Sequence, residues 1–116
     1  MSKTLLDDYC RAHNHGVRTG DFSGLLALFA TNATLTFHGI PVGPFHGRKA
    51  IAEAFASQPP DNELVLFGPR IDEAGRQTVR YRWKRSPADP GGTLLASIRE
   101  NLIHHLEIFV DQEESR

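Results

Sequence analysis

The sequence has little cysteine, no long apolar run and no excess of charge of either sign. Cys10 is the only cysteine among the 116 residues, so an internal disulfide is excluded and a reducing compartment is favoured. No segment approaches the roughly 18 to 20 consecutive apolar residues of a membrane span. The first residues lead into acidic ones rather than into an apolar signal core. These absences predict a cytoplasmic protein with no membrane partner.

The balance of charge also narrows the choice of partner. Lys and Arg number 13 against 14 Asp and Glu, for a formal net charge of −1. Nucleic-acid binding usually requires a basic excess, so we expect no nucleic-acid partner. The sequence is 40% hydrophobic and 23% charged, which is typical of a globular protein. Its length predicts one domain, residues 1–116.

The N-terminal part of the chain has helical periodicity. Apolar residues recur at spacings of three and four over residues 5–17, as on one face of a helix. Thr4 is placed to cap this helix, and Gly16 and Gly20 are placed to end it. The same periodicity predicts two further helices, one that follows Asp21 and runs through Phe29 and one at residues 48–57.

The rest of the chain is typical of strands, because β-branched and aromatic residues alternate with polar ones. A loop rich in Gly and Pro is predicted over 39–47. Helices segregated from a mainly antiparallel sheet indicate an α+β fold, in which helices cover one face of a curved sheet and leave a concave space. Strands are predicted at 33–37, 64–67, 79–84, 93–98 and 102–110, with Ile71 as a candidate continuation of the second.

Short motifs along the chain give this pattern a family resemblance. They are Thr-Gly-Asp at 19–21, Leu-Phe-Ala-Thr-Asn-Ala-Thr-Leu at 28–35, Phe-His-Gly-Arg-Lys-Ala-Ile at 45–51 and Asn-Leu-Ile at 101–103. In this order the sequence resembles the nuclear transport factor 2-like superfamily, specifically its small bacterial SnoaL-like and ketosteroid isomerase-like members. The resemblance implies a cone-shaped domain in which three N-terminal helices pack on a curved, mainly antiparallel sheet and enclose a pocket.

The resemblance also implies a range of functions, since this fold serves isomerases, dehydratases, cyclases and binding modules. Ketosteroid isomerases use a carboxylate base with a Tyr and a protonated Asp as oxyanion hole. The corresponding positions fall near His13, on Phe37 or His38, and near Leu94 or Leu95. None of these residues matches the family pattern, so we do not expect a steroid isomerase of the known mechanism.

Histidines are the remaining candidates for acid–base chemistry, because imidazole takes and gives a proton near neutral pH. His13 shares a helical face with Tyr9, and His38 ends the first predicted strand. Alternation along 102–110 places His104 on the same face as Leu106, which the resemblance turns toward the pocket. We therefore predict His13, His38 and His104 as catalytic residues. For each, simple packing or solvation is the alternative.

Aromatic and aliphatic residues at the expected pocket wall are candidates for ligand contact. Tyr81 and Trp83 would supply a hydroxyl and a flat ring, although both also suit a packed core. The predicted ligand-binding residues are Tyr9, Phe37, Phe55, Tyr81, Trp83 and Leu106.

No cofactor or metal site is predicted. His13 and His15 would diverge on a helix, and His104 and His105 would lie on opposite faces of a strand. The sequence thus favours a cofactor-free isomerase, cyclase or dehydratase acting on a hydrophobic, ring-bearing compound. The alternative is a non-catalytic ligand-binding or dimerisation module of the same fold. In either case the resemblance implies a homodimer formed through the outer sheet face.

Overall fold

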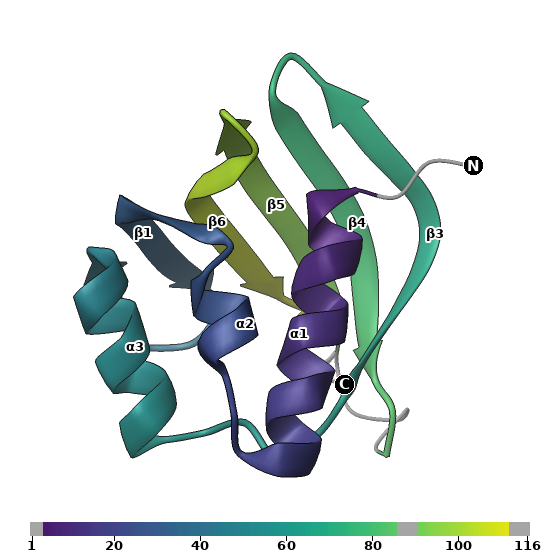
Figure 1. Ribbon diagram of the computed structural model, residues 1–116. Coiled ribbons are helices and arrows are strands. Elements are labelled where there is room, and N and C mark those ends of the chain that lie inside the picture. Colours follow the sequence, from purple (N-terminus) through teal and green to yellow (C-terminus); the bar gives the residue numbers. More distant parts are fainter. Residues whose placement is uncertain (1–3, 86–90, 112–116) are drawn as a thin grey trace.

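The computed structural model describes residues 4–85 and 91–111, and within them the chain forms three helices and six strands (Figure 1). One four-residue helix is a single turn, and one strand has two residues. In chain order the elements are α1 (Leu5–Thr19), α2 (Ser23–Leu26), β1 (Phe29–His38), β2 (Phe45–His46), α3 (Arg48–Ser57), β3 (Leu64–Glu73), β4 (Arg76–Trp83), β5 (Gly92–Arg99) and β6 (Leu102–Val110).

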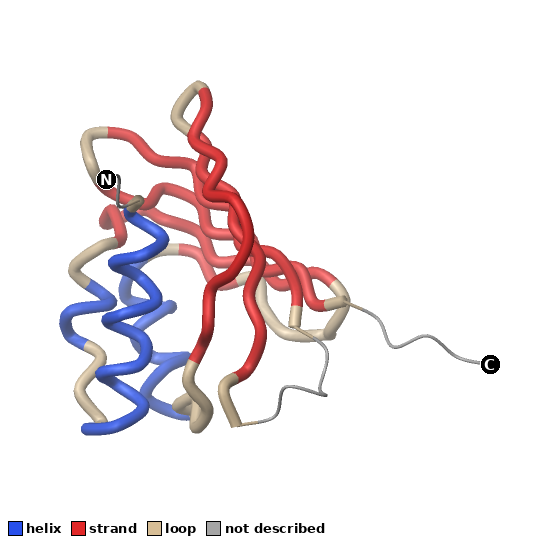
Figure 2. Tube along the Cα trace, turned by 90° about the vertical axis from the view of Figure 1, so that its right-hand side faces the viewer, coloured by secondary structure: helices blue, strands red, loops and turns tan. Residues whose placement is uncertain are grey.

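The strands form one curved sheet in the order β2-β1-β6-β5-β4-β3. The β1–β6 pair is parallel and the other pairs are antiparallel. Figure 2 shows the helices on one side of this sheet, which bends strongly along its strands. The predicted α+β class, with helices over one face of a mainly antiparallel sheet, is confirmed. No helix in the described ranges has the length and apolar character needed to cross a bilayer.

Helix α1 begins at the predicted cap and ends later than its first glycine. The backbone N–H of Asp7 donates to Oγ1 of Thr4, and the N–H of Thr4 donates to the Asp7 carboxylate. Gly16 lies inside the helix, where a Cβ would come within 2.2 Å of the Phe22 ring. Gly20, at φ 86°, ends the helix in the left-handed conformation. Gly16 therefore allows close packing rather than termination.

Several boundaries differ from those predicted. Helix α2 stops after one turn because Phe29 already pairs with Ile103 at the start of the parallel ladder. The loop predicted over 39–47 contains β2, which pairs with β1. Strand β3 continues past residue 67 to Glu73 and includes Ile71. Pairing between distant segments, rather than local periodicity, sets these limits.

Strand β6 carries a bulge at His104. Ser97 of β5 pairs with His105 and the next residue, Ile98, pairs with Ile103, so His104 is the extra residue. The turn before it has positive φ at both Glu100 and Asn101, at 55° and 63°. The bulge changes which residues of β6 are buried.

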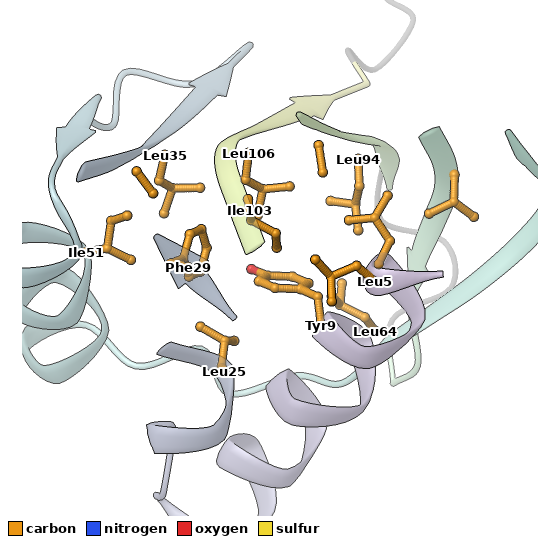
Figure 3. Packing of buried hydrophobic residues seen from close by; sticks show 14 of the residues in the cluster. Leu5, Tyr9, Leu25, Phe29, Leu35, Ile51, Leu64, Leu94, Ile103 and Leu106 are labelled. Atoms are coloured by element: carbon orange, nitrogen blue, oxygen red, sulfur yellow. The ribbon is translucent and has the colours of Figure 1, made fainter. Parts of the chain in front are cut away.

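The core lies between the helices and the inner face of the sheet (Figure 3). Tyr9 is at its centre, with its ring edge-on to Phe29 at 6.3 Å between centroids. Ile103 and Leu106 of β6 are fully buried there. Further along β6 the inward residues line a cavity instead, so the space under the sheet is solid at one end and hollow at the other.

Candidate functional site

The hollow end contains a cavity of about 290 Å³ between α1, α3 and the inner face of the sheet. Its walls are mainly apolar and aromatic, and the lining residues whose side chains contain a polar atom are Tyr9, His13, Gln58, Tyr81 and Trp83. The lining residues are Tyr9, His13, Leu35, Phe37, Ile40, Val42, Phe45, Ala54, Phe55, Gln58, Pro60, Leu64, Tyr81, Trp83, Leu94, Ile108 and Val110.

The loop after β1 marks the opening of the cavity. Ile40 and Val42 line it and are each 40% exposed, an unusual exposure for large aliphatic side chains. Phe45 of β2 and Phe55 of α3 form the wall nearby. An apolar entrance of this kind suits an apolar ligand.

Aromatic rings form one continuous side of the cavity. The ring of His13 lies 6.2 Å from that of Tyr9 and 6.4 Å from that of Trp83, between centroids. Trp83 in turn meets Tyr81 edge-on at 5.7 Å. Helix α1 and strand β4 together thus supply an imidazole flanked by larger rings, a surface suited to a flat ligand.

His13 is the one histidine in the described part of this wall, and it is 4% exposed. Burial lowers its pKa, and the contacts with Asn14 and Glu63 only partly oppose this effect. The imidazole is therefore neutral at pH 7. A neutral imidazole in an apolar cavity can accept a proton from a bound molecule and return it.

Asn14, which the sequence did not single out, holds His13 in place. Oδ1 of Asn14 lies 3.1 Å from Nδ1 of His13. The same amide bonds the backbone of Leu64 at the start of β3, so it ties α1 to the sheet. Helical spacing gives no signal for this contact, because its partners lie 50 residues apart.

The two tyrosines keep their protons at neutral pH. Burial, with a smaller contribution from the Asp111 carboxylate, raises the pKa of Tyr81 to about 12. Burial also raises the pKa of Tyr9. The hydroxyl of Tyr81 donates to the carbonyl of Phe109 over a long 3.5 Å. Both phenols are therefore hydrogen-bond donors and not bases.

Cys10 lies on the same helix but is not an activated nucleophile. Burial raises the pKa of its thiol, and the Asp7 carboxylate adds to this effect. Its Sγ donates to the carbonyl of Leu64 at 3.4 Å. Cys10 is therefore a packed thiol.

The comparisons with known proteins agree with this architecture. A family model for the SnoaL-like domain matches residues 10–108, most of the chain. The chain belongs to the SnoaL-like family. No match was found among curated proteins.

Solved structures with this fold cover nearly the whole SnoaL-like protein at low identity. A protein from Rhodopseudomonas palustris, provisionally assigned as an isomerase, is 15% identical with a TM-score of 0.75, covering 97% of this chain and 93% of that one. One from Kribbella flavida, provisionally a ketosteroid isomerase, is 14% identical with a TM-score of 0.69, covering 93% and 78%. One from Sinorhizobium meliloti, provisionally a polyketide cyclase, is 20% identical with a TM-score of 0.64, covering 87% and 93%. These likenesses show the nuclear transport factor 2-like fold.

Most residues predicted to contact a ligand lie in the cavity wall of this SnoaL-like protein. Tyr9, Phe37, Phe55, Tyr81 and Trp83 all line it. Leu106 was expected there, but it is fully buried in the core, and the next inward residues of β6 reach the cavity instead.

The predicted histidines do not share the cavity. His38 follows inward-facing Phe37, so strand alternation turns it to the outer face, where its ring stacks on Phe109 at 4.3 Å. Its Nε2 lies 3.0 Å from Oε1 of Glu107. His104 is the bulged residue of β6, so it does not belong to the inward-facing set, and its Nδ1 lies 3.3 Å from Nη2 of Arg99. The expectation that His38 and His104 line one pocket with His13 is therefore wrong.

Acidic residues and metal-binding clusters are lacking in the described part of the site. Within residues 4–85 and 91–111 the cavity wall contains no carboxylate. In the same ranges, no three His, Cys, Asp or Glu side chains gather in a way that could hold a metal ion. Phe37 and Leu94, two of the positions that the resemblance compares with the acids of ketosteroid isomerases, line the cavity. His13 is therefore the one residue of the described wall suited to act as a base.

Proposed function

We propose that this SnoaL-like protein binds a hydrophobic, ring-bearing small molecule in the cavity and moves a proton on it with His13. The observation that carries the proposal is a buried, neutral imidazole set between aromatic rings in an apolar cavity. At about 290 Å³ the cavity is near the lower end of ligand pockets, which suits a molecule of one or two rings.

The chemistry needs only one base and one hydrogen-bond donor. His13 accepts a proton from a carbon conjugated with a carbonyl group of the ligand. The electron pair of the broken C–H bond is delocalised onto the carbonyl oxygen, which becomes negative. The phenol of Tyr9, or that of Tyr81 once it leaves its long bond to the Phe109 carbonyl, donates a hydrogen bond to that oxygen as it becomes negative. The imidazolium then returns the same proton at another position, so no atom is gained or lost. Isomerisation and intramolecular cyclisation both fit this sequence, and the names of the Rhodopseudomonas and Sinorhizobium proteins support these classes.

The walls around His13 would favour such a reaction. Apolar side chains exclude water, which strengthens the interaction between the phenol and the developing negative charge. Water would otherwise compete for the proton on His13. The aromatic wall would hold a flat ligand parallel to it and so fix the distance to the base.

A pair of phenylalanine substitutions on α3 tests binding. Ala54 lines the cavity, so Ala54→Phe should fill it and abolish the rise in melting temperature caused by a two-ring compound such as 2-naphthol. Ala56 is exposed on the same helix, so Ala56→Phe should keep that rise. Equal ligand-induced shifts in both variants would show that the ligand binds elsewhere.

A non-catalytic binding module is the second candidate. The described cavity wall has no carboxylate, so none is available there to stabilise the His13 imidazolium during turnover. This lack favours the binding module. His13→Gln separates the two functions. Loss of turnover with binding retained supports catalysis, whereas a parent protein that binds and never turns over supports the module.

The outer sheet face would serve self-association in either case. Phe67 lies there under the Arg80 guanidinium, 5.9 Å from ring centroid to Cζ, and Phe109 lies on the same face. We propose that two copies pair through this mixed aromatic and charged surface. Light scattering that finds only 12.9 kDa particles at micromolar concentration would contradict it. A cytoplasmic location stays a prediction from the sequence.

A further inference from the structure

The side-chain amide of Asn14 has only one possible orientation. The backbone N–H of Leu64 donates to its Oδ1 over 2.7 Å, and its Nδ2 donates to the carbonyl of Leu64 over 2.9 Å. A backbone N–H can only donate and a carbonyl can only accept, so the oxygen and the nitrogen of the amide cannot be exchanged. Two hydrogen bonds to the backbone of Leu64 in β3 thus fix the orientation of the amide.

This orientation decides which nitrogen of His13 carries the proton. Oδ1 is the Asn14 atom that faces Nδ1 of His13, at 3.1 Å. An amide oxygen only accepts hydrogen bonds, so Nδ1 must donate. His13 is neutral because burial lowers its pKa, and its single ring proton is therefore on Nδ1. Nε2 is left with a free electron pair.

The free electron pair on Nε2 is accessible to a molecule in the cavity and not to bulk water. His13 is 4% exposed, and its ring lies between those of Tyr9 and Trp83 in the cavity wall. Nδ1 is occupied by Asn14, so Nε2 is the nitrogen available to an occupant. The phenols of Tyr9 and Tyr81 keep their protons, so Nε2 is an acceptor among donors.

We propose that Asn14 is a positioning residue that fixes His13 as the Nδ1–H tautomer, and that the cavity consequently selects ring compounds that present a hydroxyl proton to Nε2. The second part rests on the proposed function, because it assumes that a ring compound enters the cavity. The first part does not. A buried acceptor left without a donor costs free energy, so an occupant without a hydroxyl binds less tightly.

The tautomer can be measured on the protein without any ligand. Long-range ¹H–¹⁵N correlation spectra of the ¹⁵N-labelled chain, recorded at pH 8, distinguish a protonated ring nitrogen from a bare one. We expect His13 to have a protonated Nδ1 and a bare Nε2. A protonated Nε2 would overturn the proposal.

Two substitutions at Asn14 test its role as the positioning residue. Asn14→Asp keeps an oxygen toward Nδ1 and should retain the tautomer, whereas Asn14→Leu removes the acceptor and should give a mixture of tautomers. If Asn14→Leu keeps a pure Nδ1–H tautomer, another group positions His13 and the role given to Asn14 is wrong. Should that variant fail to fold, the parent spectrum and Asn14→Asp still decide the question.

A matched ligand series tests the selection of a hydroxyl. 2-Naphthol, 2-methylnaphthalene and 2-methoxynaphthalene share two rings, but only the first has a hydroxyl proton. We expect the parent protein to bind 2-naphthol roughly 2- to 12-fold more tightly than the other two, the effect of one net hydrogen bond. His13→Phe should bind all three equally.

The outcomes separate the two proposals. Equal binding of all three compounds by the parent protein would overturn hydroxyl selection and leave the cavity as a binding site. Binding of none of them would overturn hydroxyl selection together with the proposed function, whatever tautomer the spectra show.

Discussion

The two faces of strands β1 and β6 use the same residue types for different purposes. On the inner face, Phe37 and Ile108 line an apolar cavity, and His13 reaches it from α1. On the outer face, His38 stacks on Phe109 and contacts Glu107. The His38 side chain is 42% exposed, whereas His13 is 4% exposed. Burial, rather than residue type, makes one imidazole a candidate base and gives the other a surface contact.

The outer face also forms polar pairs across its strands. Oγ1 of Thr36 lies 2.9 Å from Nε2 of His105, next to the pair of His38 and Glu107. Polar partners and solvent satisfy these imidazoles outside the cavity. On the inner face the amide of Asn14 satisfies one nitrogen of His13 and leaves the other for a ligand. A histidine that serves a site can therefore be recognised by a buried ring nitrogen that has no hydrogen-bond partner in the protein.

The largest loss of stability should come from truncating a side chain on the inner face. Leu106 is fully buried, so Leu106→Ala should lower the free energy of unfolding by about 2 to 5 kcal/mol. Leu95 lies on the outer face of neighbouring β5, opposite Glu107, so Leu95→Ala should cost roughly 1 kcal/mol or less. Urea unfolding at pH 7 measures both. Equal losses would contradict the distinction between a packed and a solvated face.

A smaller loss of stability should appear when His13 is protonated at low pH. Its pKa in the native state lies below the ordinary 6.5 because of burial, so the unfolded chain binds the proton more readily. The stability that depends on neutral His13 is complete above pH 6.5 and is lost as the pH falls from there through the native pKa. His13→Gln should remove this loss, measured as the free energy of unfolding between pH 8 and pH 5.

His15 on the same helix is the matched control for that series. It is exposed, so His15→Gln should leave the loss of stability in acid as it is in the parent. If His13→Gln and the parent depend on pH in the same way, His13 is not the buried neutral group that the cavity requires.

The smallest loss of stability should come from disrupting the pair of His38 and Glu107 on the outer face. Glu107→Gln removes the charge next to His38 but leaves a hydrogen-bonding side chain of similar size. Because both side chains are partly exposed, at 42% for His38 and 20% for Glu107, the loss at pH 7 should be about 1 kcal/mol or less. Thermal unfolding of the variant detects it. Measured on the monomer, a loss as large as that of Leu106→Ala would contradict the account of a solvated outer face. A larger loss that appears only at concentrations where copies pair would instead reflect the proposed self-association through this face.

Local pattern was enough to predict the layers of the fold. The helical spacing over residues 5–17 matches α1, and Tyr81 and Trp83, expected at the pocket wall, lie on the inward face of β4. Asparagine tolerates the left-handed region, which agrees with the positive φ of Asn101. Alternation failed at His104, because a bulge shifts the inward set by one residue and depends on pairing with β5. Periodicity cannot show where an extra residue is accommodated.

The candidate site was only partly predictable for a related reason. His13 and its neighbours Tyr9 and Trp83 follow from periodicity together with the family resemblance. Asn14 does not, because its partner Leu64 is 50 residues away and the contact is with backbone, which leaves no trace in residue type. The position of Leu106 in the core and not in the cavity depends on how far the helices extend under the sheet. Such depths are properties of the packed molecule.

One titration tests the central claim, that the inner face and not the outer face receives a ligand beside His13. The aromatic ¹H–¹³C NMR spectrum of the assigned protein is followed while 2-naphthol is added. We expect the signals of His13, Phe37 and Trp83 to shift together with one dissociation constant, and those of His38 and His105 to stay in place. Shifts confined to the outer-face histidines would contradict the claim.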